Sequence, residues 1–184
     1  MRPSHVIELP HHALRFPPTF TQAEREVVLL VLEGLSNAEI AARRGRSERT
    51  VANQIAALLE KADVYTRGEL LAACAPPQPV APGSWATLLE GRWRLAAVPR
   101  SDALRFVARE HPLNLSDGER TALEAVAQGA PNKQIAPVLG LGLRAAGRRV
   151  ECAVEKLGVP RLYLPLLRAL SSFSCPHPVE AHAA

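Results

Sequence analysis

The chain has 184 residues, of which 47% are hydrophobic and only 4% aromatic, and its formal net charge is +4. A composition rich in Ala and Leu with few rings is typical of small helical units rather than of a β-sandwich or barrel. The sequence has no apolar run of about 18 residues and no secretion leader, so we expect a cytoplasmic protein without a membrane span. Its three cysteines lie far apart without a C-x-x-C pair, which predicts neither disulfides nor a zinc site.

Residues 1–19 are interpreted as an amino-terminal arm with a possible strand, and residues 20–75 as a unit of four helices. Each helix is predicted from a Ser or Thr that can cap its first turn and from apolar residues recurring at helical spacing. The predicted helices are Gln22–Glu33 after Thr21, Asn37–Arg44 after Ser36, Glu48–Lys61 after Ser47, and a fourth helix after Tyr65 and Thr66. Gly34 and Gly45 end the first two helices.

Basic residues cluster around the bend between the second and third of these helices. Residues 20–75 carry seven Lys/Arg against eight Asp/Glu, so the cluster is not the result of a generally basic unit. A helix that reads DNA buries one stripe and presents short polar or basic groups to base edges, while nearby arginines hold phosphates. Arg49 is predicted to pair with guanine and Asn53 or Gln54 with adenine, because these side chains match the donors and acceptors of the major groove. Arg43, Arg44 and Arg46 are predicted to contact phosphates.

The segment "FTQAEREVVLLVLEGLSNAEIAARRGRSERTVANQIAALLEKADVYTRGEL" resembles the LuxR (GerE-type) helix-turn-helix family. The matching positions are Phe20-Thr21, Glu24-Arg25-Glu26, Gly34, Ser36-Asn37, Glu39-Ile40-Ala41, Ser47, Thr50-Val51, Lys61 and Val64. Ala52 and Gln54 stand where the family often has Lys and His. The resemblance implies a DNA-binding transcription regulator. The candidate DNA-binding residues of this unit are Arg43, Arg44, Arg46, Ser47, Arg49, Thr50, Asn53, Gln54 and Lys61.

A second copy of the unit is predicted over residues 113–173, because the sequence repeats itself without a gap after a shift of 95 positions. The identical pairs include Glu24/Glu119, Arg25/Arg120, Gly34/Gly129, Asn37/Asn132, Ile40/Ile135, Gly45/Gly140, Arg49/Arg144, Lys61/Lys156 and Val64/Val159. The letters "ALRF" also occur twice, at 13–16 and 103–106, so the duplicated segment is interpreted as including an upstream strand.

The second copy departs from the first in its second and third helices. Pro137 lies inside a predicted helix, where proline costs about 3 kcal/mol unless the helix bends, and Gly142 and Gly147 weaken the next helix. That helix nevertheless carries three arginines, Arg144, Arg148 and Arg149. Two interpretations remain open: the second copy holds phosphates with little sequence preference, or it has become a partner-binding or dimer-forming module.

Residues 76–112 are predicted to hold a Pro-rich linker, a short helix from Ser84 to Gly91, and a β-hairpin of 92–98 and 103–108. The hairpin arginines are interpreted either as a clamp on the DNA backbone or as a solvated strand face, and they are Arg92, Arg94, Arg105 and Arg109. Residues 174–184, with Cys175 and His177, are predicted to be a disordered tail. The fold class is therefore mainly α: two tandem four-helix helix-turn-helix modules joined by a Pro-rich linker and a short β-hairpin.

Enzyme classes are disfavoured, because the sequence has no H-E-x-x-H motif, no paired carboxylates in a cleft pattern and no Gly-rich phosphate loop. No cofactor and no metal are expected. The expected partner is double-stranded DNA, with the transcription machinery as a further possible partner. The resemblance implies dimerisation through the fourth helix, so the chain would act as an intramolecular pseudo-dimer with recognition helices about 34 Å apart, or as a homodimer. The alternative function is a protein-interaction module that sequesters another regulator or a polymerase subunit without reading DNA.

Overall fold

The computed structural model describes residues 5–76 and 85–171. The prolines of the linker between these ranges, Ser84 as a helix cap, and the tail after residue 171 lie outside the described residues. Where it is described, the chain is mainly helical with a small antiparallel sheet, as the sequence indicates.

The first helical unit contains the four helices that the sequence predicts, within one or two residues at each end. They are α1 (Gln22–Leu32), α2 (Asn37–Arg44), α3 (Glu48–Lys61) and α4 (Arg67–Ala73). Each begins at the predicted cap, because the side chains of Thr21, Ser36, Ser47 and Thr66 all accept a hydrogen bond from the backbone N–H three positions later. Such caps satisfy donors that the first turn of a helix leaves free.

The second helical unit repeats this order. Its elements are α6 (Asp117–Ala127), α7 (Asn132–Val138), α8 (Leu143–Leu157), a 3-10 turn (Arg161–Tyr163) and α9 (Leu164–Ser171). Ser116 and Glu119 form a capping box at the start of α6. The cap positions of α7 and α8 are Pro131 and Gly142, which supply no side-chain hydrogen bond. The short helix α5 (Trp85–Leu89) precedes the sheet.

The sheet has three strands rather than the two of the predicted hairpin. They are β1 (His5–Pro10), β2 (Trp93–Pro99) and β3 (Ala103–Glu110), all antiparallel, in the order β1-β3-β2. The strand of the amino-terminal arm is thus β1, whose register pairs Ile7 with Phe106 and Leu9 with Leu104.

The interpretation of the first "ALRF" segment as a strand is wrong. Residues 103–106 open β3, whereas Ala13 ends a 3-10 turn at His11–Ala13 and residues 14–16 are irregular chain. Pro17 and Pro18 come next, and because proline has no backbone N–H, a strand at 13–16 could not continue its hydrogen-bond ladder. The same four-residue sequence therefore adopts different structures at its two places in the chain.

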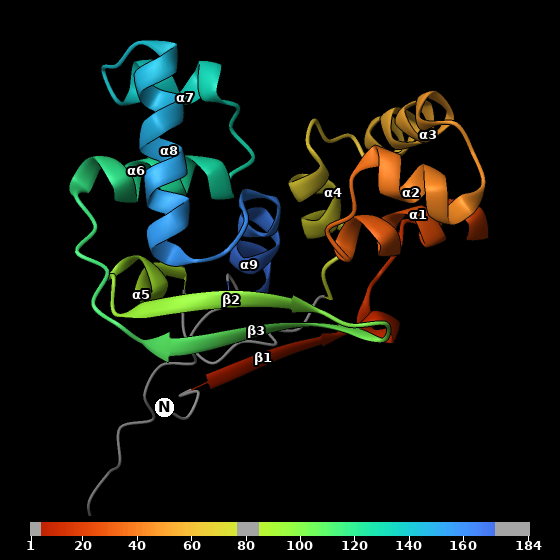
Figure 1. Cartoon of the computed structure of the whole chain (residues 1–184), viewed down its shortest axis with the longest axis horizontal. Coiled ribbons are helices and arrows are strands. Elements are labelled where there is room, and N and C mark those ends of the chain that lie inside the picture. The colour runs from red at the N-terminus through yellow and green to blue at the C-terminus, as the bar shows by residue number, and fades with distance from the viewer. Residues whose placement is uncertain (1–4, 77–84, 172–184) are drawn as a thin grey trace, which may run out of the picture.

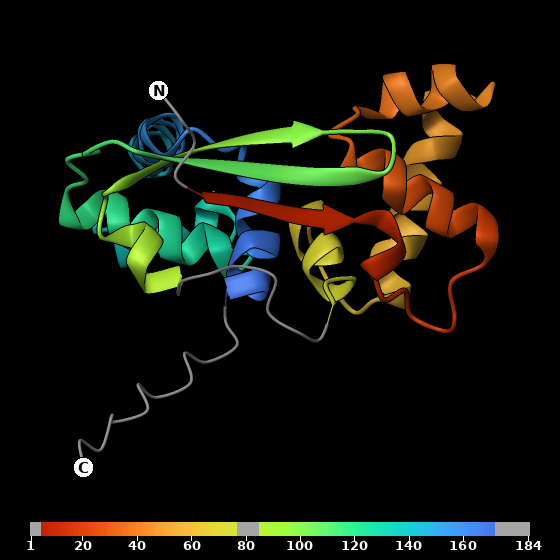
Figure 2. The same cartoon turned by 90° about the horizontal axis from the view of Figure 1, so that it is seen from below.

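The two helical units lie side by side on one face of the sheet (Figures 1 and 2). The alternating residues of the strands explain this arrangement, since Leu9, Leu95, Leu104 and Phe106 are buried toward the helices. These side chains belong to one continuous core that also includes residues of both helical units. The units and the sheet consequently form a single packed body.

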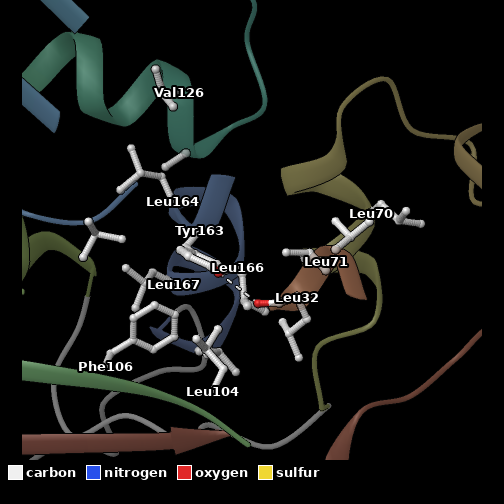
Figure 3. Packing of buried hydrophobic residues seen from close by; sticks show 14 of the residues in the cluster. Leu32, Leu70, Leu71, Leu104, Phe106, Val126, Tyr163, Leu164, Leu166 and Leu167 are labelled. Carbon is white, nitrogen blue, oxygen red and sulfur yellow. Dashed lines mark hydrogen bonds between the residues drawn. The ribbon is translucent and has the colours of Figure 1, made fainter. Parts of the chain in front are cut away.

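Helices α4 and α9, the fourth helices of the two units, pack directly against each other (Figure 1). Their approach is close at Gly68, where an added Cβ would lie 2.8 Å from the carbonyl oxygen of Leu162 and 2.9 Å from Cγ of Pro165. Figure 3 shows a second link between the units, in which the buried hydroxyl of Tyr163 donates a 2.9 Å hydrogen bond to the carbonyl oxygen of Leu32. Burial raises the pKa of Tyr163 to about 12, so the hydroxyl keeps its proton.

Candidate nucleic-acid interface

The bend between α2 and α3 is fixed by local interactions. Ser36 and Glu39 form a capping box that starts α2, and the hydrogen bonds from Ser36 lower the pKa of Glu39, so its carboxylate stays charged beside the helix amino terminus. Gly45 ends α2 in the left-handed region at φ 61°, which glycine adopts without strain. Ser47 then caps α3, and its hydroxyl lies 2.8 Å from that of Thr50.

Helix α3 is oriented by one buried stripe. Val51, Ile55 and Leu58 are at most 5% exposed and hold the helix against α1, α2 and α4. Because a helix has 3.6 residues per turn, this stripe fixes which side chains point outward. The exposed face carries Arg49, Thr50 and Asn53, and Arg46 is exposed in the preceding turn.

The predicted arginines of the bend fall into two groups. Arg43 forms an ion pair with Glu33 at 2.5 Å, and Arg44 lies 3.8 Å from Glu26 and donates to Gln54 at 3.4 Å. Arg46 and Arg49, in contrast, have no side-chain partner among the residues that the structure describes. The unpaired group is therefore the one nearest the start of α3, where the side chains are free to meet a ligand.

Lys61 lies at the other end of α3 and has an intramolecular partner. Its Nζ donates to the carboxylate of Glu24 at 2.7 Å, and the hydrogen bond from Lys61 is the largest of the effects that lower the pKa of Glu24. Lys156 and Glu119 make the same contact in the second unit, also at 2.7 Å. The same Glu–Lys pair occurs at equivalent positions of both units. We therefore interpret Lys61 as a residue that joins the third helix to the first.

Glu119 is the more deeply buried member of these two pairs, at 4% exposure. Burial alone would raise its pKa, but hydrogen bonds from Lys156, the Ser116 backbone and the Cys152 thiol together lower the pKa to about 2. The Cys152 sulfur lies 3.3 Å from Oε1 of Glu119, and this contact raises the pKa of the thiol. The Glu119 cluster thus holds α6 to α8 through charge.

The three predicted arginines of the second unit do not share one environment. Arg144 and Arg148 are exposed on α8, at the positions that Arg49 and Asn53 occupy on α3. Arg149 is half-buried and lies over Gly118 in the first turn of α6, where an added Cβ would meet its guanidinium at 2.4 Å. Only Arg144 and Arg148 therefore match the outward face of the first unit.

One pair of positioning residues was missed by the sequence analysis. Arg67 donates to the Leu35 carbonyl oxygen at 3.1 Å and also bonds Asn37, while Arg161 donates to Ala130 and Asn132 at 2.9 and 2.6 Å. The acceptors are equivalent in the repeat, but the two arginines are one position out of its register, so the alignment did not pair them. Arg67 ties the start of α4 to the start of α2, and Arg161 ties the 3-10 turn before α9 to the start of α7.

Arg105 and Arg109 alternate along β3 with the buried residues that face the helices, whereas the side chain of Arg94 lies beside Gly158 at the end of α8. Arg94 and Arg109 are paired across β2 and β3 and are exposed, and Arg105 bonds Glu8 at 3.0 Å, which raises its pKa. In Figure 1 the sheet lies below the helical units and α3 lies at the upper part of the molecule. A clamp by these arginines on DNA held at α3 is therefore not supported by their placement.

Within residues 5–76 and 85–171, no group of three or more His, Cys, Asp or Glu is arranged to hold a metal ion. Over the same ranges, no helix has both the length and the apolar surface needed to cross a membrane.

Comparison with known proteins identifies part of the chain. Residues 21–61, which contain α1, α2 and α3, match the family Sigma-70, region 4. No curated protein and no solved structure matches the chain. The match does not extend to the LuxR family itself or to the second unit, so both of those assignments stay predictions. Residues 21–61 are similar to Sigma-70, region 4, and have the helix-turn-helix fold of DNA-binding domains connected with transcription.

Proposed function

We propose that this protein is a transcription regulator that reads DNA by placing the exposed face of α3 in the major groove. The observation that carries the proposal is the group Arg46, Arg49 and Asn53, whose exposed side chains have no partner among the described residues. Arg49 and Asn53 lie on α3, which its cap and its buried stripe hold in place, and Arg46 lies in the turn before it. Recognition helices present the same combination of residues near their amino-terminal ends.

The contacts of the candidate residues support a separate role for each of them. Arg49 is the candidate for a bidentate bond to guanine, and Asn53 is a better candidate for adenine than Gln54, because Gln54 already accepts a hydrogen bond from Arg44. Arg46 is the candidate for a phosphate contact. Arg43 and Arg44 must exchange carboxylate partners for phosphates, so we expect each to add less to the affinity than Arg46 does.

The second unit is proposed to be a second helix-turn-helix module that takes the place of a dimer partner. The packing of α4 on α9 supports this, because it joins the fourth helices of two units that share their element order and their Glu–Lys pair. A pseudo-dimer of this kind is monomeric in solution at 19.9 kDa. Light scattering during size-exclusion chromatography tests it, and a mass of two chains at micromolar concentration would favour the homodimer instead.

Binding of the full chain to labelled genomic DNA fragments at two salt concentrations tests the reading function. Arg49→Ala and Asn53→Ala are expected to remove discrimination among fragments, at roughly 1–3 kcal/mol for each lost base contact. Arg100→Ala is the charge-matched control, since Arg100 is an exposed residue in the β2–β3 turn. If Arg100→Ala has the same effect as Arg49→Ala, the binding depends on total charge and the proposed reading by α3 is wrong.

A chain that binds no DNA fragment selectively would instead favour the interaction-module function. The match to Sigma-70, region 4 directs that search to the transcription machinery, with a polymerase subunit or another regulator as the sequestered protein. The two functions are distinguished by the same binding experiment, because a sequestering module needs no base contacts from Arg49.

A further inference from the structure

The turn of the second helix-turn-helix differs from that of the first in one consistent way. Residues 42–49 read "ARRGRSER", and the equivalent residues 137–144 read "PVLGLGLR". Three arginines and a glutamate of the first turn are thereby replaced by apolar residues: Arg43 by Val138, Arg44 by Leu139, Arg46 by Leu141 and Glu48 by Leu143.

The backbone of the two turns is the same. Gly45 and Gly140 occupy equivalent positions and adopt φ 61° and 63°, so the second turn has not collapsed to hide its apolar side chains. Val138 is 64% exposed and Leu143 57% exposed, while Leu139 and Leu141 are half-buried. We call these four residues the apolar tip.

No other element of the described chain covers the apolar tip. Helix α7 packs on α6 and α8, and Figure 1 shows the α7–α8 turn at the end of the second unit that points away from the sheet. Exposed large apolar groups gathered on one turn mark an interaction surface, in contrast to single exposed residues scattered over a protein.

The charges around the apolar tip indicate the chemistry of its partner. Lys133, Arg144 and Arg148 are exposed beside it, and no Asp or Glu occurs between positions 131 and 150. A second copy of this tip would bring like charges together, which disfavours a symmetric contact between two chains. Phosphates would gain nothing from Val138 and Leu143, so DNA fits the tip poorly.

We propose that the apolar tip and its basic rim form a docking site for an acidic amphipathic helix of another protein. Such a helix sets apolar anchors at positions i, i+3, i+4 and i+7 against the tip, while Asp or Glu on its flanks meet Lys133, Arg144 and Arg148. This site is separate from α3 and does not depend on whether α3 reads DNA.

The probe is a fluorescein-labelled peptide of about 18 residues, with Leu at i, i+3, i+4 and i+7, Glu at the positions that flank this stripe, and Ala elsewhere. Fluorescence anisotropy with the full chain is expected to show saturable binding that weakens as salt is added. A peptide with Lys in place of each Glu, and a scrambled acidic peptide, are expected to bind about tenfold more weakly or not at all.

The variant Val138→Arg/Leu143→Glu gives positions 138 and 143 the residues that stand at the equivalent positions of the first turn, Arg43 and Glu48. The side chains of Val138 and Leu143 are both more than half exposed, so we expect the thermal midpoint to stay unchanged while the acidic peptide binds about tenfold more weakly. Val98→Arg, an apolar-to-basic change at a 38% exposed position of β2, is the matched control and should leave peptide binding intact.

Three results would overturn the docking site. The first is equal binding of the acidic, scrambled and Lys-containing peptides, and the second is undiminished peptide binding by Val138→Arg/Leu143→Glu. The third is an NMR titration in which duplex DNA shifts the amide resonances of residues 131–150 and the acidic peptide does not. That result would mean that the apolar tip binds nucleic acid. None of these measurements uses the Arg49→Ala variant. The docking test therefore stays valid even if α3 does not read DNA.

Discussion

The close approach of α4 and α9 can be tested with two Gly→Ala substitutions that share their chemistry but differ in their surroundings. Gly68 is buried in the first turn of α4, and its added methyl group would lie 2.8 Å from the backbone oxygen of Leu162. Gly147 lies inside α8, where the methyl group would meet only the side-chain nitrogen of Asn132 at 3.3 Å. The first neighbour is backbone of the other unit, whereas the second can shift by a few tenths of an ångström.

The two substitutions are therefore expected to change the free energy of unfolding in opposite directions. At position 147, alanine gains up to about 1 kcal/mol of helix propensity. At position 68 the gain is smaller, because the residue is in the first turn, and overpacking costs about 1–3 kcal/mol. We expect Gly68→Ala to lower the free energy of unfolding by about 1–2 kcal/mol and Gly147→Ala to raise it. For a chain of this size each kcal/mol shifts the thermal midpoint by about 2–4 °C.

Urea unfolding followed by circular dichroism, together with thermal melts, measures both values. Equal stabilisation by the two substitutions would refute the reasoning, because it would mean that α4 does not approach the second unit closely enough to exclude a methyl group.

Two further predictions concern buried polar groups. Tyr163→Phe leaves the carbonyl oxygen of Leu32 without its 2.9 Å donor and should lower the free energy of unfolding by about 1–3 kcal/mol in urea titrations; an unchanged value would mean that the bond between the units contributes nothing. Because the pKa of Glu119 falls from 4.5 to about 2 on folding, its carboxylate should contribute on the order of 3 kcal/mol above pH 4.5 and lose this contribution as the pH falls toward 2. Glu119→Gln should therefore flatten the dependence of unfolding free energy on pH between 7 and 3, and parallel curves for the two proteins would contradict the role given to this residue.

The helices of the first unit could be predicted because their signals are local. A Ser or Thr cap, an acidic residue three positions later and an apolar stripe lie within one or two turns of each other, as in Ser36, Glu39 and Ile40. The exposed face of α3 follows from the same periodicity. The partners of the basic residues could not be predicted in this way. Glu26 lies on α1 and Glu33 caps its end, and they meet Arg44 and Arg43 only after the helices pack.

The sheet and the contact between units depend on distant residues. Strand β1 is only six residues long. Its pairing with β3 depends on the burial of Ile7 and Leu9 in the core and not on a pattern within its own sequence. The sequence "LYLPLLRAL" gave a clearer indication of contact between the units. A helix that is apolar on nearly every side must be surrounded by other elements. Leu164, Leu166 and Leu167 are fully buried in α9, and that pattern pointed to a helix enclosed by both units and the sheet.

Strand β1 also constrains how the protein can be assembled during synthesis. Glu8 and Arg105, which face each other across β1 and β3, are 97 positions apart in the chain. At about 5–20 residues per second, the ribosome needs on the order of 5–20 s to make the partner strand after the first one has appeared. Ile7 and Leu9 have no sheet to join during that interval. Exchange of β1 between neighbouring nascent chains is thus the expected route of misassembly, and it would produce dimers linked by their first strands.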